Sequence, residues 1–274
     1  MKRKRDKTPA SFLCAAKYPV VLVHGTGFRD RKHLDYWGRI PGALAQEGAK
    51  VFYSHQDAWG TVERNAAMVK RAVTAVLAET GAEKVNILAH SKGGLEARYM
   101  IAVLGMGDRV ASLTTICTPH HGSKTMDAIL KTMPRLYRFA GWFVDRFFKL
   151  LGDAEPAFYE TSRQFTTAHA RAFNEAFRDD ERVYMQSYAS SLRSVFDDFL
   201  FGMTHLFVRR LDGPNDGLVS VESAKWGRYR GEMNAGKRGL SHADEVDALR
   251  MNVKGYDIRR FFIEVVRELK EMGF

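Results

Sequence analysis

The sequence predicts an α/β protein with a mostly parallel sheet that helices cover on both faces. Four short apolar runs are typical of buried strands, and segments with helical spacing separate them; the runs are residues 20–23, 51–53, 85–88 and 113–117. Strands that alternate with helices form parallel sheets, because each helix carries the chain back across the sheet. The length of 274 residues and the 45% share of hydrophobic residues suit one sizeable core, so we expect a single domain over residues 17–274.

The chain is basic, with 42 Lys and Arg residues against 32 Asp and Glu residues and a formal net charge of +10. The basic residues are spread along the chain, and the one tight cluster, residues 2–5, lies in a terminal tail at residues 1–16. No nucleic-acid-binding motif accompanies the charge. We therefore expect a solvated basic tail and no nucleic-acid partner.

The tail resembles the start of an export signal, but the apolar stretch after it, residues 12–16, is far shorter than the roughly 7–15 residues that such a signal needs. No uncharged apolar run approaches the roughly 20 residues of a membrane span. We expect a cytoplasmic protein, with a secreted mature form as the alternative. Cys14 and Cys117 are too few for a disulfide framework, so two buried thiols are expected and one bridge stays open.

A candidate nucleophile follows the third strand. The apolar run ends in Ala89, and Ser91 then stands ahead of Gly93 and Gly94. Small flanking residues let a strand and a helix pass closely at a strained turn, which exposes the serine hydroxyl above the sheet. The N-terminus of the next helix favours a developing oxyanion at that point. The alternative is an ordinary corner between a strand and a helix.

The first strand ends in a turn that glycines bracket, His24-Gly25-Thr26-Gly27. In acyl-transfer enzymes, a loop after an early strand supplies one N–H group of the oxyanion hole, and the residue after the nucleophile supplies the other. The backbone N–H groups of Thr26 and Lys92 are our candidates. The alternative is a plain connection from strand to helix.

An acid and a histidine follow in the last third of the chain. Asp216 lies in a turn that we expect to follow a strand at residues 206–211, and His242 lies in the last loop before a C-terminal helix. Apolar residues at helical spacing, the last of them Met272, form the expected buried stripe of that helix. The order serine, acid, histidine belongs to one serine-hydrolase architecture and differs from the order in the others. His120 and His121 also end a strand at the same edge of the sheet. We rank both below His242, because either one as base leaves the later acid and histidine without a role.

Residues 136–151 form a predicted helix with large apolar groups around most of its surface and basic residues between them. Its aromatic residues include Trp142, Phe143, Phe147 and Phe148. Such a helix must bury its aromatic groups, either as a core helix or as a mobile cap that covers a hydrophobic cleft and contacts lipid interfaces. We favour the cap, because basic residues flank the aromatic groups as they do in helices that bind interfaces. The cap belongs to an insertion at about residues 125–180.

Five stretches together resemble the bacterial true lipases of the α/β-hydrolase superfamily, the group of the Pseudomonas and Burkholderia triacylglycerol lipases. They are Tyr-Pro-Val-Val-Leu-Val-His-Gly at residues 18–25, Ala-His-Ser-Lys-Gly-Gly at 89–94, Thr-Pro-His-His-Gly-Ser at 118–123, Asn-Asp-Gly-Leu-Val at 215–219 and His-Ala-Asp-Glu-Val at 242–246. The resemblance implies an α/β-hydrolase fold with a lid. It also implies an esterase or triacylglycerol lipase that acts on lipid or ester substrates with Ser91 as nucleophile, Asp216 as acid and His242 as base.

The resemblance implies no cofactor for the chemistry, but it does imply a structural calcium ion with Asp244 as a ligand. The family's oxygen ligand four residues later is Ala248 here, and the partner aspartate is either Asp197 or Asp198. Calcium takes roughly six to eight oxygen ligands, so the loss of one weakens the site. The alternative is that Asp244 orients the histidine loop.

Two other functions stay open at this point. One is an acyltransferase that uses the same three residues, and the other is a non-catalytic lipid-binding module that kept the fold. The complete set of serine, acid and histidine argues against the second.

Overall fold

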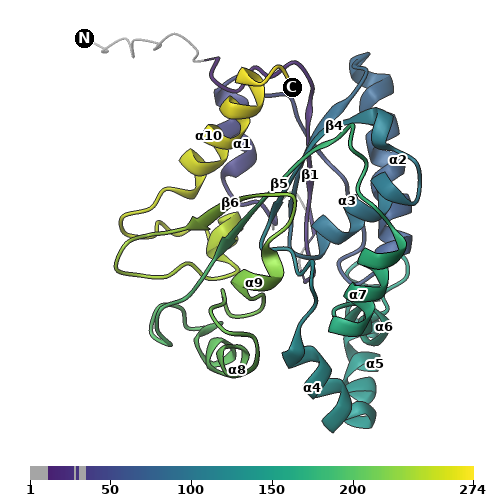
Figure 1. Cartoon of the computed structure of the whole chain (residues 1–274), viewed down its shortest axis with the longest axis vertical. Coiled ribbons are helices and arrows are strands. Elements are labelled where there is room, and N and C mark those ends of the chain that lie inside the picture. Colours follow the sequence, from purple (N-terminus) through teal and green to yellow (C-terminus); the bar gives the residue numbers. More distant parts are fainter. Residues whose placement is uncertain (1–11, 28, 31–34) are drawn as a thin grey trace.

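The computed structural model describes residues 12–27, 29–30 and 35–274, and in these residues six strands form one sheet (Figure 1). The strands are β1 (Val20–Val23), β2 (Val51–Tyr53), β3 (Val85–His90), β4 (Val110–Ile116), β5 (Tyr184–Ser190) and β6 (Arg228–Met233). Their order across the sheet is β2-β1-β3-β4-β5-β6, and every neighbouring pair is parallel. The predicted α/β class with a parallel sheet is confirmed. The basic cluster at residues 2–5 lies outside the described residues.

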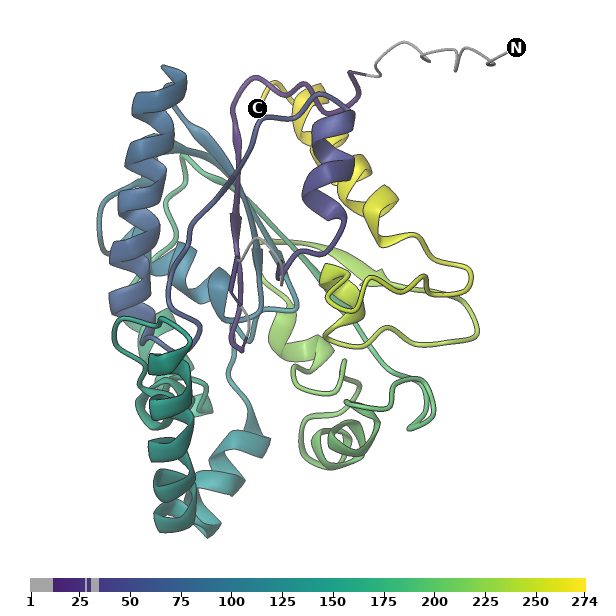
Figure 2. The same cartoon turned by 180° about the vertical axis from the view of Figure 1, so that it is seen from behind.

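Helices cover both faces of the sheet (Figures 1 and 2). Helices α1 (Ile40–Gln46) and α10 (Ile258–Glu271) cover one face, and α2 (Val62–Thr80) and α3 (Lys92–Ala102) cover the other. Side chains alternate along each strand, so Val20 and Leu22 of β1 pack toward α1 and α10 while Val21 and Val23 pack toward α2 and α3. A strand buried on both faces must be apolar throughout, which explains the continuous hydrophobic runs.

Further helices lie beyond the carboxyl ends of the strands (Figure 1). Between β4 and β5 the chain forms α4 (Lys124–Thr132), α5 (Pro134–Leu150), α6 (Phe158–Gln164) and α7 (Thr167–Ala176), where the insertion was expected. After β5 come α8 (Gly202–Asp212) and α9 (Val221–Ala224). The described residues also contain two short 3₁₀ helices, η1 (Gly107–Arg109) before β4 and η2 (Asp244–Val246) before α10. The Asp212 carboxylate accepts hydrogen bonds from the backbone N–H groups of Lys124 and Thr125, both at 2.8 Å, so α8 is tied to α4.

Three details of the predicted secondary structure are wrong. Residues 206–211 are not a strand but the second half of α8, in which Val208 is buried three residues after His205, at helical spacing. Strand β6 was not predicted, because it lies at the sheet edge and its residues are largely charged and partly exposed. Met272, expected in the buried stripe of α10, is 44% exposed because the helix ends at Glu271.

Cys14 and Cys117 are both buried and both free, so the described chain has no bridge between them. Among the described helices, none combines the length and the apolar character needed to cross a membrane.

Candidate active site

Strand β3 runs into helix α3 through a tight turn at Ser91. Ser91 has φ 54° and ψ −130°, a conformation that costs an L-residue strain energy and is typical of functional turns. A Cβ atom on Gly93 would lie 2.5 Å from the carbonyl oxygens of both Val23 and His24, so only glycine lets α3 approach the end of β1 this closely. The turn therefore holds Ser91 at the carboxyl end of the sheet, directly before the first N–H groups of α3, which have no partner within a helix.

Asp216 and His242 form a hydrogen-bonded pair at the same end of the sheet. Asp216 Oδ2 lies 2.7 Å from His242 Nδ1, and Asp216 Oδ1 accepts the N–H groups of Leu218 at 2.8 Å and Val219 at 2.7 Å. Burial acts to raise the pKa of Asp216, but the charge of protonated His242 and these hydrogen bonds outweigh burial, and the pKa is lowered. A charged carboxylate therefore fixes the tautomer and the orientation of the imidazole.

Ser91 adjoins this pair through its neighbour His90. The ring centroids of His90 and His242 lie 4.4 Å apart. Within the described residues, no hydrogen bond joins the Ser91 hydroxyl to His242. Such bonds in hydrolases are often long until substrate binds, so Ser91 and His242 stay the candidates for nucleophile and base.

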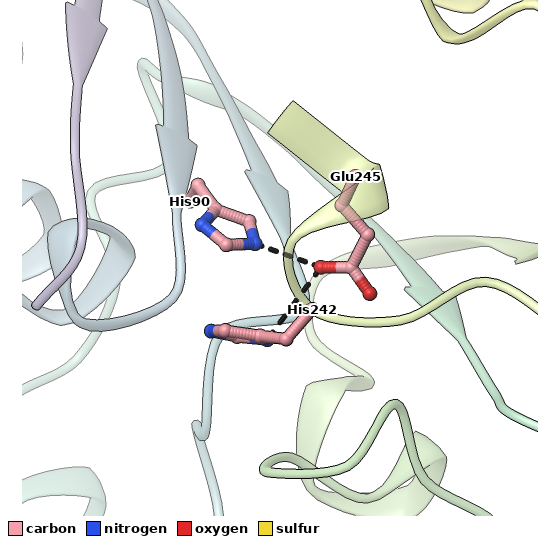
Figure 3. A group of neighbouring side chains, drawn as sticks. All are labelled: His90, His242 and Glu245. Atoms are coloured by element: carbon pink, nitrogen blue, oxygen red, sulfur yellow. Dashed lines mark hydrogen bonds and ion pairs between the residues drawn. The ribbon is translucent and has the colours of Figure 1, made fainter. Parts of the chain in front are cut away.

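Glu245 is a second acid at the site that the sequence prediction missed. Its Oε2 lies 2.7 Å from His90 Nε2 and 3.6 Å from His242 Nδ1 (Figure 3), and its other oxygen accepts the Ser190 hydroxyl. Burial raises the pKa of Glu245 well above its usual range, and the negative charge of Asp216 raises it further. Burial and this neighbouring charge both favour the neutral form of Glu245, which contacts His90. The sequence did offer a signal, because Glu245 follows His242 by three residues, and residues three apart on a 3₁₀ turn lie on the same side.

The side chain of Lys92 is buried in a polar network behind the candidate oxyanion hole. Its Nζ lies 2.6 Å from Glu96 Oε1 and 2.8 Å from the carbonyl oxygen of Gly60. Gln56 Nε2 donates to Glu96 at 3.0 Å and to the carbonyl oxygen of His24 at 2.9 Å. The network thus connects the helix behind the nucleophile with the turn that carries Thr26.

Ser91 and Thr26 line one cavity of about 220 Å³. The rest of its wall is largely apolar and comes from several elements: Trp59, Pro119, Ser123, Met126, Tyr137, Ser162, Phe165, Leu218 and Val219. Tyr137 belongs to α5, so the predicted cap helix forms part of the wall around the candidate nucleophile. An apolar cavity beside a serine suits the acyl chain of an ester.

The four predicted lid aromatics lie in two environments. Phe148 is partly buried and packs on Trp59 of the cavity wall, with ring centroids 6.1 Å apart. Trp142, Phe143 and Phe147 are 53%, 53% and 56% exposed. Helix α5 is therefore not a core helix, and its movement as a lid stays a prediction.

The two histidines after β4 have other partners. His120 is buried, hydrogen-bonds the Thr115 hydroxyl at 3.0 Å and stacks on Trp226. Burial lowers the pKa of His120 well below its usual range, and the nearby Arg98 charge lowers it further. His121 Nε2 lies 3.1 Å from the carbonyl oxygen of Lys225. Both contacts are compatible with ranking His242 first as the base.

Asp244 contacts an arginine, and its surroundings do not fit a calcium ion. Asp244 Oδ2 accepts Arg238 Nη1 at 2.9 Å and both the N–H and the hydroxyl of Ser241 at 3.0 Å. The carboxylates of the two proposed partners also face donors: Asp197 accepts three backbone N–H groups, and Asp198 accepts two. A guanidinium, a hydroxyl and six amide N–H groups bind these carboxylates and leave few of the free oxygens that a hard cation requires.

Arg238 connects Asp197 and Asp244, two of the residues that were expected near a calcium ion. Its Nε donates to the carbonyl oxygen of Asp197 at 2.8 Å while Nη1 contacts Asp244. The arginine therefore joins the loop after β5 to the loop that carries His242. This agrees with the alternative that Asp244 orients the histidine loop.

Comparison with known proteins decides the family. A model of the alpha/beta hydrolase fold matches residues 18–196. The chain belongs to the α/β-hydrolase family. A triacylglycerol lipase of Vibrio cholerae is 30% identical to this α/β-hydrolase over 265 residues, which cover 85% of the present chain and 80% of the Vibrio protein.

Two further relatives bear on the assignment. A triacylglycerol lipase of Burkholderia plantarii is 36% identical over 187 residues, so the match spans 61% of this chain and 50% of the length of that relative. The solved structure of the Bacillus licheniformis lipase BlEst2 in mature form superposes with a TM-score of 0.68 at 20% identity and covers 97% of this chain and 96% of that chain, which supports the fold. With lipases as its relatives, this α/β-hydrolase is a carboxylic ester hydrolase. The predicted resemblance and fold are confirmed.

The Lys92–Glu96 pair yields a first prediction. Lys92→Met should lower the free energy of unfolding by about 3–5 kcal/mol, because it leaves Glu96 buried without its cation. Adding Glu96→Leu should recover only part of that stability, because Gln56 and Asn65 then lose their buried acceptor. Turnover of a soluble ester should nevertheless stay roughly tenfold low in the double variant, because the network no longer holds the turn with Thr26. Thermal unfolding and kcat measure the two effects, and full recovery of kcat in the double variant would show that the pair serves stability alone.

Arg238 yields a second prediction. A chelator should leave the melting temperature of the native protein unchanged. Arg238→Ala should lower it by roughly 1–4 °C, as expected for a partly exposed ion pair, and should reduce kcat/KM because the His242 loop is released. Arg230→Ala is the matched control, since Arg230 pairs with Glu268 at 2.8 Å with similar exposure. If a chelator lowers the melting temperature and added calcium reverses the effect, the protein does bind a structural calcium ion and the prediction is wrong.

Proposed function

We propose that this α/β-hydrolase cleaves carboxylic esters of lipids, with Ser91 as nucleophile, His242 as general base and Asp216 as the acid that orients it. The observation that carries the proposal is the 2.7 Å contact between Asp216 and His242 beside a strained serine elbow. An ordinary corner between a strand and a helix needs neither the strain nor the buried pair. The triacylglycerol lipases among the relatives support lipid esters as the substrate class.

In this mechanism His242 Nε2 accepts the Ser91 proton as Oγ attacks the ester carbonyl. The N–H groups of Thr26 and Lys92 stabilise the tetrahedral oxyanion, and the alcohol leaves with the proton from His242. Water then attacks the acyl group on Ser91, with His242 again as base, and the carboxylic acid departs. Asp216 stays charged throughout and stabilises protonated His242.

Helix α5 is the proposed lid of a triacylglycerol lipase. Tyr137 and Phe148 hold it at the cavity wall, while Trp142, Phe143 and Phe147 face solvent. Exposed apolar surface carries a free-energy cost of about 25 cal/mol per Å², so a lipid interface would favour states that cover these rings. The lid would thereby open where the substrate is concentrated.

Replacement of the nucleophile is the direct test. Ser91→Ala should lower kcat by about 10⁴-fold or more, and an active-site-directed phosphonate should label Ser91 in the native protein. Ser162→Ala is the matched control, because Ser162 lines the same cavity and its hydroxyl contacts Tyr137 at 3.0 Å. Labelling of another residue, or loss of less than about tenfold in Ser91→Ala, would refute the triad.

The lid is tested by comparing emulsified with soluble substrate. Native activity on a long-chain triglyceride should rise once the substrate forms an emulsion, and Trp142 fluorescence should change with detergent micelles. Phe143→Ser with Phe147→Ser should reduce emulsion activity by roughly tenfold more than activity on a soluble short-chain ester. Met272→Ser, an exposed apolar residue after α10, is the control. Equal loss on both substrates would make α5 a fixed part of the fold and the protein an esterase.

A further inference from the structure

Helix α8 and the loop before it carry a second set of exposed apolar side chains, at the same end of the molecule as α5 (Figures 1 and 2). The set is Phe196, Phe199, Leu200, Met203, Leu206 and Phe207. On α5 the exposed apolar residues are Leu136, Phe139, Trp142, Phe143, Phe147 and Leu150. We call the two sets together the apolar rim. Surface phenylalanines concentrated in two segments require a partner, whereas isolated ones do not.

The two helices of the apolar rim share one neighbour. Helix α4 lies beside both α5 and α8, and Asp212 of α8 binds the first backbone N–H groups of α4. The cavity with Ser91 includes Met126 of α4 and Tyr137 of α5. Helix α4 therefore connects both helices of the rim with the cavity.

The carboxylates within the rim segments are turned toward backbone N–H groups. Asp145 of α5 accepts the N–H of Phe158 at 2.7 Å, and Asp198 accepts two N–H groups of the loop before α8. Asp197 and Asp212 accept backbone N–H groups in the same manner. These acids therefore bind backbone donors and form no ion pair with the cations of the rim segments.

The basic residues of the same segments face outward. Exposed cations are Arg135, Arg138, Arg146, Lys149, Arg193, Arg209 and Arg210. None of these forms an ion pair with a described acid. Arg146 instead lies over the ring of Trp142 at 5.0 Å, and Arg138 over that of Tyr159 at 4.6 Å. The rim segments thus combine apolar groups with an excess of cations over acids.

We propose that the apolar rim docks this enzyme on an anionic lipid bilayer, with the aromatic groups in the headgroup region and the cations on lipid phosphates. Apolar insertion and attraction to anionic lipid reinforce each other in surface-bound helices. A neutral oil droplet would use the apolar groups alone, and a second copy of this chain would bring like charges together. The inference rests on the proposed function only in that docking brings lipid esters to the site.

Vesicle co-sedimentation of the full chain tests the proposal, with Ser91→Ala so that lipid is not consumed. Binding to phosphatidylcholine vesicles that contain phosphatidylglycerol should exceed binding to phosphatidylcholine alone, and added salt should weaken it. Arg135→Gln with Arg210→Gln should reduce affinity by roughly 30-fold, about fivefold for each charge. The matched control is Arg71→Gln with Arg260→Gln, which removes two exposed cations from α2 and α10.

The apolar part is tested separately with Phe199→Ser in the loop before α8 and Met203→Ser on α8, and circular dichroism verifies that these variants fold. Both should weaken vesicle binding by roughly tenfold or more. Equal binding to neutral and anionic vesicles, equal loss in the control pair, or a concentration-dependent dimer that masks the rim would overturn the proposal. Hydrolysis of a soluble ester by the native protein is assayed in parallel, so that a failure of docking and a failure of the proposed chemistry give different results.

Discussion

The close approach of helix α3 to the end of strand β1 is the constraint on which the site depends. Gly93 permits it, because any Cβ there would meet two carbonyl oxygens at 2.5 Å. The approach brings the first N–H groups of α3 toward the turn with Thr26, and it forces Ser91 into a conformation with positive φ. The buried Lys92–Glu96 pair and Gln56 then connect the two segments from behind. Packing of backbone on backbone thus determines where a reactive hydroxyl can lie.

Two buried acids near one histidine have pKa values that are shifted in opposite directions. Asp216 receives hydrogen bonds from two backbone N–H groups and from His242, so its charged form is favoured. Glu245 has the carboxylate of Asp216 nearby and lies in a fully buried position, so its neutral form is favoured. Pairs of titratable groups whose surroundings separate their pKa values commonly divide roles in this way. Asp216 is suited to stabilise a positive His242, and Glu245 to hold His90 without competing for that charge.

The sequence predicted those parts of the molecule that local chemistry determines. Apolar runs marked β1 to β4, because a parallel sheet buried on both faces requires continuous hydrophobic strands. Ser91, Asp216 and His242 could be selected from chain order and turn residues, and the structure brings the acid and the histidine into contact. Edge strand β6 was missed and helix α8 was misassigned as a strand. Both are partly exposed, so neither shows a clear pattern of buried apolar residues in its sequence. The contact of Glu245 with His90 and that of Arg238 with Asp197 join segments far apart in the chain, which no single stretch of sequence records.

The central claim is that Ser91, His242 and the N–H groups of Thr26 and Lys92 converge on one reacting ester. A crystal structure of the enzyme after reaction with a phosphonate ester tests it most directly, since the tetrahedral phosphorus mimics the intermediate. The account predicts a covalent bond from phosphorus to Ser91 Oγ, one phosphonate oxygen within about 3 Å of both N–H groups, and His242 Nε2 in hydrogen-bonding distance of Oγ or the leaving oxygen. An adduct whose oxygen points away from Thr26 and Lys92, or in which His120 occupies the place of His242, would contradict it.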